Sequence, residues 1–129
     1  MAVQVPVSVG ELIDKLTILS IKEACIADPF KLVNIGREKQ ALERVVQAQG
    51  FRSLEGVVAL EAELRAVNEQ LWAIEDRLRD CERQCSFGLE FVDLARAVYK
   101  TNDQRADLKR QINQLTGSEL VEEKSYAAY

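Results

Sequence analysis

Apolar side chains recur at helical spacing through the middle of the chain. Between residues 57 and 85 they advance by steps of three and four, at Val57, Leu60, Leu64, Val67, Leu71, Ile74, Leu78, Cys81 and Cys85. Such steps are the a/d pattern of helices that pack side by side, and the two-residue period of a strand cannot produce them. The pattern predicts one long helix over about residues 54–84, with Ser53 as its N-cap.

A second seam of the same kind follows after a short gap. It consists of Phe91, Leu94, Val98, Thr101, Arg105, Leu108, Ile112 and Leu115. This seam predicts a helix over about residues 89–115 that ends before Gly117. Because only a short turn separates the two long helices, we expect them to form an antiparallel hairpin.

A third helix is predicted near the N-terminus, over about residues 9–27. Ser8 and Glu11 have the spacing of a capping box, in which each side chain accepts a hydrogen bond from the other residue's free backbone N–H. The helix is apolar on most of its sides. We therefore expect it in the centre of the bundle or partly in a subunit interface.

A fourth helix is predicted over about residues 29–49. Asp28 and Pro29 are typical of an N-cap and a first helical position, and Gly50 suits the residue that ends a helix. Gly36 inside this helix costs about 1 kcal/mol relative to alanine, so we interpret it as a kink or a close helix contact.

Together these elements predict an all-α protein, a four-helix bundle in which the two N-terminal helices pack on the long hairpin. The chain of 129 residues is long enough for a single domain with an ordinary core. Residues 118–129 are expected to form a C-terminal tail that folds back or frays.

Composition and charge narrow the possible functions. The formal net charge of −4 argues against general nucleic-acid binding, which usually needs a basic surface. No apolar run approaches the roughly 20 residues that cross a bilayer, and no positive charge precedes the apolar N-terminal residues, as it would in a signal peptide. We therefore expect a cytoplasmic protein without a nucleic-acid or membrane partner.

The chain contains no histidine. This excludes Ser-His and Cys-His nucleophile pairs, the HExxH zinc site and the Glu-x-x-His di-iron site. The three cysteines, an odd number, do not indicate a disulfide framework. Cys81 and Cys85 share one helical face, and we interpret them as core residues rather than half of a metal site. We therefore predict no metal and no cofactor.

Two charged residues lie at apolar positions. Arg105 interrupts the second seam, opposite about residue 69 in the hairpin, and an unpaired guanidinium there would be costly. It is either part of a structural ion pair that fixes the register of the helices or a ligand-binding arginine. Asp14 lies on an apolar face of the first helix, and we expect it to pair with Arg105 or Lys109.

Polar side chains also form a stripe beside each seam. These facing stripes could line a polar cleft between the two long helices, in which Arg79, Arg105 and Lys109 hold an anion and Glu75 or Asp14 acts as acid or base. The alternative is a solvated flank with i,i+4 pairs such as Glu75–Arg79. No catalytic residue is assigned. The candidate ligand-binding residues are Asp14, Asn68, Trp72, Glu75, Arg79, Tyr99, Asn102, Arg105 and Lys109.

Several strings of the sequence carry a resemblance that covers nearly the whole chain. They are VSVGELIDKLTIL with IK at 21–22, VNEQLWAIEDRLRDCE, FVDLARAVYKTNDQRADLKRQIN and GSELVEEKSYAAY. In this order they resemble a family of small stand-alone bacterial helical proteins known only as a domain of unknown function. The resemblance implies a short helical protein and brings no activity, cofactor or catalytic residue.

Two functions are compatible with these observations. The first is a non-enzymatic interaction or adaptor protein with a protein partner, and the apolar excess of the first helix favours a homodimer. The second is an enzyme or binding protein for a small anionic metabolite in the polar cleft. Convergence of Glu75, Tyr99, Asn102 and Arg105 on an enclosed cavity would favour the second function. If carboxylates accept hydrogen bonds from all the Arg105 donors, in a seam that excludes water, the first function would be favoured.

Overall fold

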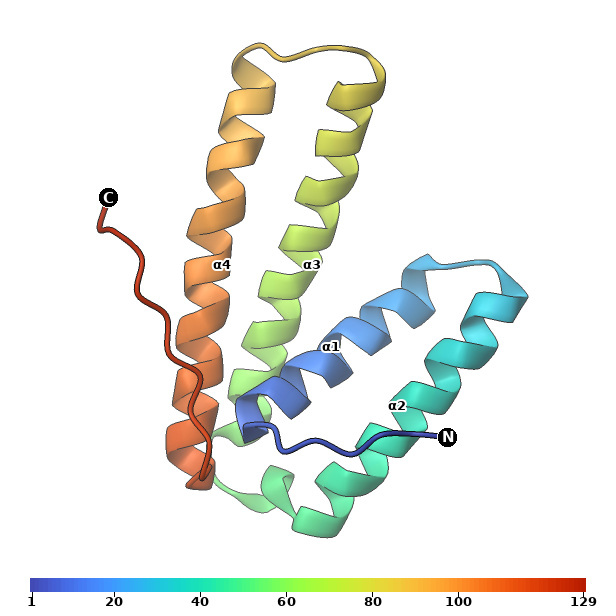
Figure 1. Ribbon diagram of the computed structural model, residues 1–129, viewed down its shortest axis with the longest axis vertical. Helices are drawn as coiled ribbons and strands as arrows, with labels where there is room; N and C mark the ends of the chain where they lie inside the picture. The colour runs from blue at the N-terminus through green and yellow to red at the C-terminus, as the bar shows by residue number, and fades with distance from the viewer.

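The computed structural model describes all 129 residues as four α-helices, one 3₁₀ turn and extended termini (Figure 1). No strand is present, so the predicted all-α four-helix bundle is confirmed. None of the helices is both long and apolar enough to cross a membrane. The elements are α1 (Val9–Cys25), α2 (Pro29–Gln49), η1 (Phe51–Ser53), α3 (Val57–Arg83) and α4 (Leu89–Thr116).

Helices α3 and α4 form the expected antiparallel hairpin, and α1 lies across the base of this hairpin (Figure 1). The three helices share one core cluster because each turns an apolar stripe toward the others. That cluster consists of Ile13 from α1, Val57, Leu64 and Val67 from α3, and Leu108 and Ile112 from α4.

Helix α1 is the central element of the fold. It contacts α2, α3 and α4, whereas α2 packs mainly on α1 through a second cluster of Leu12, Leu16 and Val46. The expectation that α1 lies in the bundle centre is therefore confirmed. Its apolar excess is covered within one chain, so the need for a subunit interface on α1 disappears.

The α1–α2 pair diverges from the hairpin and leaves its far end uncovered (Figure 1). We call residues 71–100, on either side of the turn, the distal half of the hairpin. In this half only Cys81 and Leu94 are buried. The remaining buried residues of α3 and α4 all lie nearer the base, where α1 packs.

The expected start of the third helix is wrong. Helix α3 begins at Val57 instead of residue 54, because Gly56 adopts a left-handed conformation with φ of 88° that no helix contains. Ser53 is not an N-cap, since it belongs to η1 and its hydroxyl donates to the carbonyl of Gly50 at 2.7 Å. Arg52 of η1 bridges Glu43 of α2 and Glu61 of α3, and so ties this connection to both helices.

Most other helix ends follow the sequence signals. Helix α2 has the expected bounds, with the Asp28 side chain accepting from the N–H of Phe30 at 2.9 Å and Gly50 left-handed at its end. Helix α1 ends at Cys25, two residues before the expected bound, because Ile26 is already extended. In the hairpin turn Cys85 has a φ of 52°, and its side chain is exposed rather than part of the seam.

Replacing Gly36 with alanine is expected to raise the free energy of unfolding by about 0.5–1 kcal/mol. A Cβ built on Gly36 meets no atom within 4 Å, so the predicted close helix contact at this position is wrong. Alanine would therefore remove backbone entropy from the unfolded chain without creating a clash. Urea unfolding followed by circular dichroism measures the change, and a loss of stability would contradict the open environment of Gly36.

Candidate functional site

A network of buried polar side chains joins α1 to the hairpin. At its centre is Asp14, whose side chain is completely buried. Arg105 of α4 donates to both carboxylate oxygens, from Nε at 3.0 Å and from Nη2 at 2.5 Å. Asn68 of α3 donates to Asp14 Oδ1 at 2.8 Å. Since Asp14, Asn68 and Arg105 come from three helices, this network fixes the position of α1 on α3 and α4.

Thr17 completes this network. Its hydroxyl donates to the backbone carbonyl of Asp14 at 2.7 Å and accepts from the Asn68 amide at 2.8 Å. No buried side-chain nitrogen or oxygen in the protein lacks a hydrogen-bond partner. The free-energy cost of burying these groups is therefore largely offset, as charge burial requires. We call Asp14, Thr17, Asn68 and Arg105 the Asp14 network.

The predicted pairing of Asp14 with a basic residue of the fourth helix is confirmed by this geometry. The partner expected for Arg105 from the hairpin register alone is only partly right. That register pointed to polar groups of the third helix near residue 69. Asn68 does lie in the network, but the carboxylate comes from α1. The hydrogen bonds from Arg105 to Asp14 raise the pKa of the guanidinium, so it stays charged at every physiological pH.

Lys109 lies one turn after Arg105 and is buried between α1 and the C-terminal tail. Its ammonium donates to Glu11 at 2.6 Å and to Glu122 at 3.0 Å, and lies 3.9 Å from Asp14 Oδ2. Burial opposes the charge of Lys109, but the hydrogen bonds to the two glutamates outweigh it and raise its pKa. The same contact lowers the pKa of Glu122. Lys109 therefore fastens the tail to the bundle.

The N-terminus of α1 is capped both by the preceding Ser8 and by a side chain of α4. Ser8 accepts from the N–H of Glu11 at 3.1 Å, as the capping box predicts. The Glu11 side chain instead reaches Lys109, and the N–H of Gly10 donates to Asn113 Oδ1 at 2.7 Å. The role of Gly10 was not identified from the sequence, because a glycine in the first turn of a helix carries no signal of its tertiary contacts.

A groove opens beside the Asp14 network, where α1 diverges from the hairpin. It has a volume of about 470 Å³. We call it the Trp72 groove, and it is lined by Ile18 and Ile21 of α1, by Asn68, Leu71, Trp72, Glu75, Asp76 and Arg79 of α3, and by Asn102 and Arg105 of α4. Because α1 supplies one wall, the groove lies among three helices and not between the two long ones alone.

The structure brings together six of the nine candidate residues. Asn68, Trp72, Glu75, Arg79, Asn102 and Arg105 line the Trp72 groove. Asp14 lies behind them, bonded to Arg105 and Asn68. Lys109 is held by Glu11 and Glu122 and does not line the groove, and Tyr99 lies on another side of α4. Asp76 of the groove was not among the candidates, because one acid in a run of charges gives no distinguishing signal.

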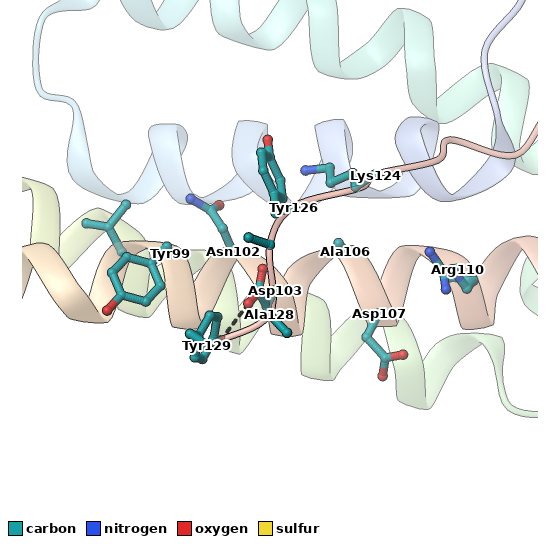
Figure 2. Close-up of a pocket in the computed structure, with 12 residues that line it drawn as sticks. Tyr99, Asn102, Asp103, Ala106, Asp107, Arg110, Lys124, Tyr126, Ala128 and Tyr129 are labelled. Carbon is teal, nitrogen blue, oxygen red and sulfur yellow. Dashed lines mark hydrogen bonds between the residues drawn. The ribbon is translucent and has the colours of Figure 1, made fainter.

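The tail forms a second hollow along α4, of about 740 Å³ (Figure 2). Tyr129 stacks edge-on against Tyr99 at 5.3 Å between ring centres and donates a hydrogen bond to Asp103 at 2.5 Å. Asn102 lines both this hollow and the Trp72 groove. Of the two outcomes expected for the tail, it folds back on α4.

Both cationic side chains of the Trp72 groove already have a carboxylate partner. Arg79 donates to Glu75 at 2.5 Å on the exposed rim, and Arg105 is bound to Asp14. No group of three His, Cys, Asp or Glu side chains is placed to hold a metal ion. The groove therefore offers an apolar wall, the Arg105 guanidinium with two of its three nitrogens bonded to Asp14, and the Asn102 amide. It has no excess of positive charge.

Comparison with known proteins gives one match. A family model with the description "Family of unknown function (DUF6165)" matches residues 3–129. Neither the curated proteins nor the solved structures that were compared contain a match.

Proposed function

We propose that this chain, which belongs to the family of unknown function DUF6165, is a non-enzymatic interaction protein. Its binding surface is the distal half of the hairpin, and its partner there is a second copy of the same chain. The observation that carries the proposal is a helical seam left without a covering helix over residues 71–100.

The seam is closed at the base of the hairpin and open at its distal half. At the base, where α1 covers it, Leu64 and Ile112 are completely buried. In the distal half the seam residues Ile74, Leu78 and Phe91 are only half-buried, because α3 and α4 have only each other there. A helix layer is stable when its apolar face packs against another element. A further helical layer would bury the distal seam as α1 buries the base.

Exposed apolar side chains also lie next to the turn, at the end of the distal half. Phe87, Leu89 and Val92 are 51%, 78% and 45% exposed. Phe87 packs edge-on against Phe91, with ring centres 5.2 Å apart, so a rigid aromatic pair marks the end of the hairpin. Aromatic and large aliphatic groups supply most of the binding free energy where proteins associate.

The charge of the distal half supports a second copy as the occupant. Six acidic and five basic residues lie between positions 71 and 100, so this part is almost neutral although the whole chain carries −4. Two copies can therefore approach here without strong mutual repulsion. A two-fold axis would place one hairpin against another and complete a four-helix layer from identical surfaces.

The second function considered, an enzyme or binding protein for an anionic metabolite, has less support. It required Arg79, Arg105 and Lys109 to hold the anion. Each of these side chains already has a carboxylate partner, and Lys109 has two close ones. An anion held by all three side chains together would have to displace these carboxylates, which argues against the three-cation site. The cytoplasm is the compartment we propose, in agreement with three free cysteines of which two are exposed.

Self-association should become weaker when charged side chains are introduced into the distal half. We expect the double variant Leu89→Glu and Val92→Glu to raise the dimer dissociation constant at least about tenfold, since two apolar contacts would be replaced by carboxylates. Both positions are exposed in the single chain, so the helical circular dichroism should not change. Sedimentation equilibrium over a series of protein concentrations measures the dissociation constant.

The matched control carries the same change on α2, at Phe30 and Val33, which are 84% and 53% exposed. We expect Phe30→Glu with Val33→Glu to leave the dimer unchanged. A wild-type chain that stays monomeric throughout the series, or a dimer that dissociates only in the α2 variant, would overturn the proposal.

A further inference from the structure

We infer that the Trp72 groove binds a small monocarboxylic acid with an apolar body. This site is separate from self-association through the distal half, and neither proposal depends on the other. Its volume of about 470 Å³ lies within the range of small-molecule pockets, roughly 300–1,000 Å³. The features that define the ligand are a guanidinium with free donors, an apolar wall and an acidic far end.

Arg105 presents donors that the protein does not use. A guanidinium has five N–H groups, and two of its nitrogens, Nε and Nη2, donate to Asp14. Nη1 has no partner within the protein, and the side chain is 29% exposed where it lines the groove. Because Asp14 is rigidly buried, the free edge of Arg105 is held in a fixed orientation. A fixed guanidinium edge suits the two oxygens of a carboxylate.

The wall beside this guanidinium is apolar. Ile18, Ile21, Leu71 and Trp72 supply four of the ten lining residues. The Trp72 indole N–H and the Asn102 amide both line the groove and form no hydrogen bond within the protein. The ligand therefore has an aromatic or branched aliphatic body next to its acid group, with room for one or two additional polar contacts.

The far end of the groove disfavours a second negative charge. Glu75 and Asp76 follow Asn68 by seven and eight residues on α3, which corresponds to about 10–12 Å along the helix. Asn68 shares Asp14 with Arg105, so the acidic residues lie at the opposite end from the guanidinium. Glu75 is paired with Arg79, but Asp76 forms no ion pair. Dicarboxylates of matching length would place a charge near Asp76 and be repelled.

Fluorescence of Trp72 provides a direct measurement, because it is the only tryptophan in the chain. We expect 3-phenylpropionate to change this fluorescence with a saturable dependence on concentration. The alcohol 3-phenylpropanol, which has the same body without the charge, should bind at least about tenfold more weakly, as loss of a charge-assisted hydrogen bond requires. Absence of saturation up to about 10 mM acid, or equal binding of the alcohol, would overturn the inference.

Variants separate the two ends of the groove. Arg105→Lys keeps a positive charge beside Asp14 but removes the free guanidinium edge. It should weaken the binding of 3-phenylpropionate at least about tenfold. Ile18→Phe keeps Arg105 and fills the groove, so it should abolish the fluorescence change even if the lysine variant folds poorly. Unchanged binding in Ile18→Phe would place the ligand elsewhere.

The acidic end is tested by the choice of ligand. We expect Asp76→Lys to strengthen binding of 3-(4-carboxyphenyl)propionate, a dicarboxylate whose second charge lies at the far end of the same body, relative to 3-phenylpropionate. Glu63→Lys is the control, because Glu63 is an exposed residue of the same helix that forms no ion pair and lies outside the groove. Equal effects of the two charge reversals would show that Asp76 does not set the selectivity.

Discussion

Replacing Arg105 with methionine should lower the free energy of unfolding by about 3 kcal/mol. Methionine preserves most of the volume but removes both hydrogen bonds to the buried carboxylate of Asp14, whose nearest remaining cation is the Lys109 ammonium at 3.9 Å. Removing one partner of a buried ion pair typically costs about 3–5 kcal/mol. The lower end applies because the Arg105 side chain keeps some contact with water. Urea unfolding followed by circular dichroism measures the loss.

Two further variants show whether this loss of stability arises from the buried carboxylate. Arg79→Met breaks the exposed Arg79–Glu75 pair on the groove rim and should cost at most about 0.5 kcal/mol. Adding Asp14→Asn to Arg105→Met makes the network neutral and should restore more than half of the lost stability, since no charge is then buried alone. A cost below about 1 kcal/mol for Arg105→Met would contradict the structural role of the Asp14 network.

Replacing Gly10 with alanine should cost a similar amount, about 3 kcal/mol. A Cβ at this position would lie 2.5 Å from the backbone carbonyl oxygen of Lys109 and 3.0 Å from Asn113 Oδ1. Neither atom is the end of a long flexible side chain, so α1 must move away from α4. That movement would also weaken the hydrogen bond from Gly10 to Asn113. Thermal and urea unfolding measure the loss.

Gly36→Ala is the matched comparison for this experiment. Both changes add one methyl group to a helical glycine, yet the expected effects have opposite signs because the surroundings differ. Stabilisation by both substitutions would mean that α1 does not approach α4 as closely at Gly10 as the structure describes.

The sequence was sufficient to predict most of the helical layout. The periodic seams predicted α3 and α4, and Asp28, Pro29 and Gly50 predicted both ends of α2, because the capping chemistry is local. The start of α3 was missed for a local reason as well. The sequence interpretation placed Gly56 inside the helix. Its left-handed backbone instead ends the segment that follows η1, and α3 begins at the next residue.

Part of the Asp14 network was also predictable. A carboxylate on an apolar face and a guanidinium in an apolar seam each need an opposite charge, so Asp14 and Arg105 could be paired from sequence. The groove could not be placed, because its shape depends on the angle at which α1 leaves the hairpin (Figure 1). Lys109 was misplaced for the same reason, since Glu11 and Glu122 reach it only in three dimensions.

The uncovered seam also became visible only in three dimensions. In the sequence the apolar pattern of α3 is uniform from Val57 to Cys81, and nothing marks where α1 stops covering it. The structure divides this one pattern into a buried base and a half-exposed distal half. The proposed interaction surface depends on this division.

Hydrogen exchange of backbone amides, measured at a low and a high protein concentration, tests the proposed surface most directly. If two copies associate through the distal half, amides within residues 71–100 should exchange more slowly at the high concentration, while those of α2 keep the same rate. The Leu89→Glu and Val92→Glu variant should lose this dependence on concentration. Identical exchange of residues 71–100 at both concentrations, or slower exchange confined to α2, would contradict the account.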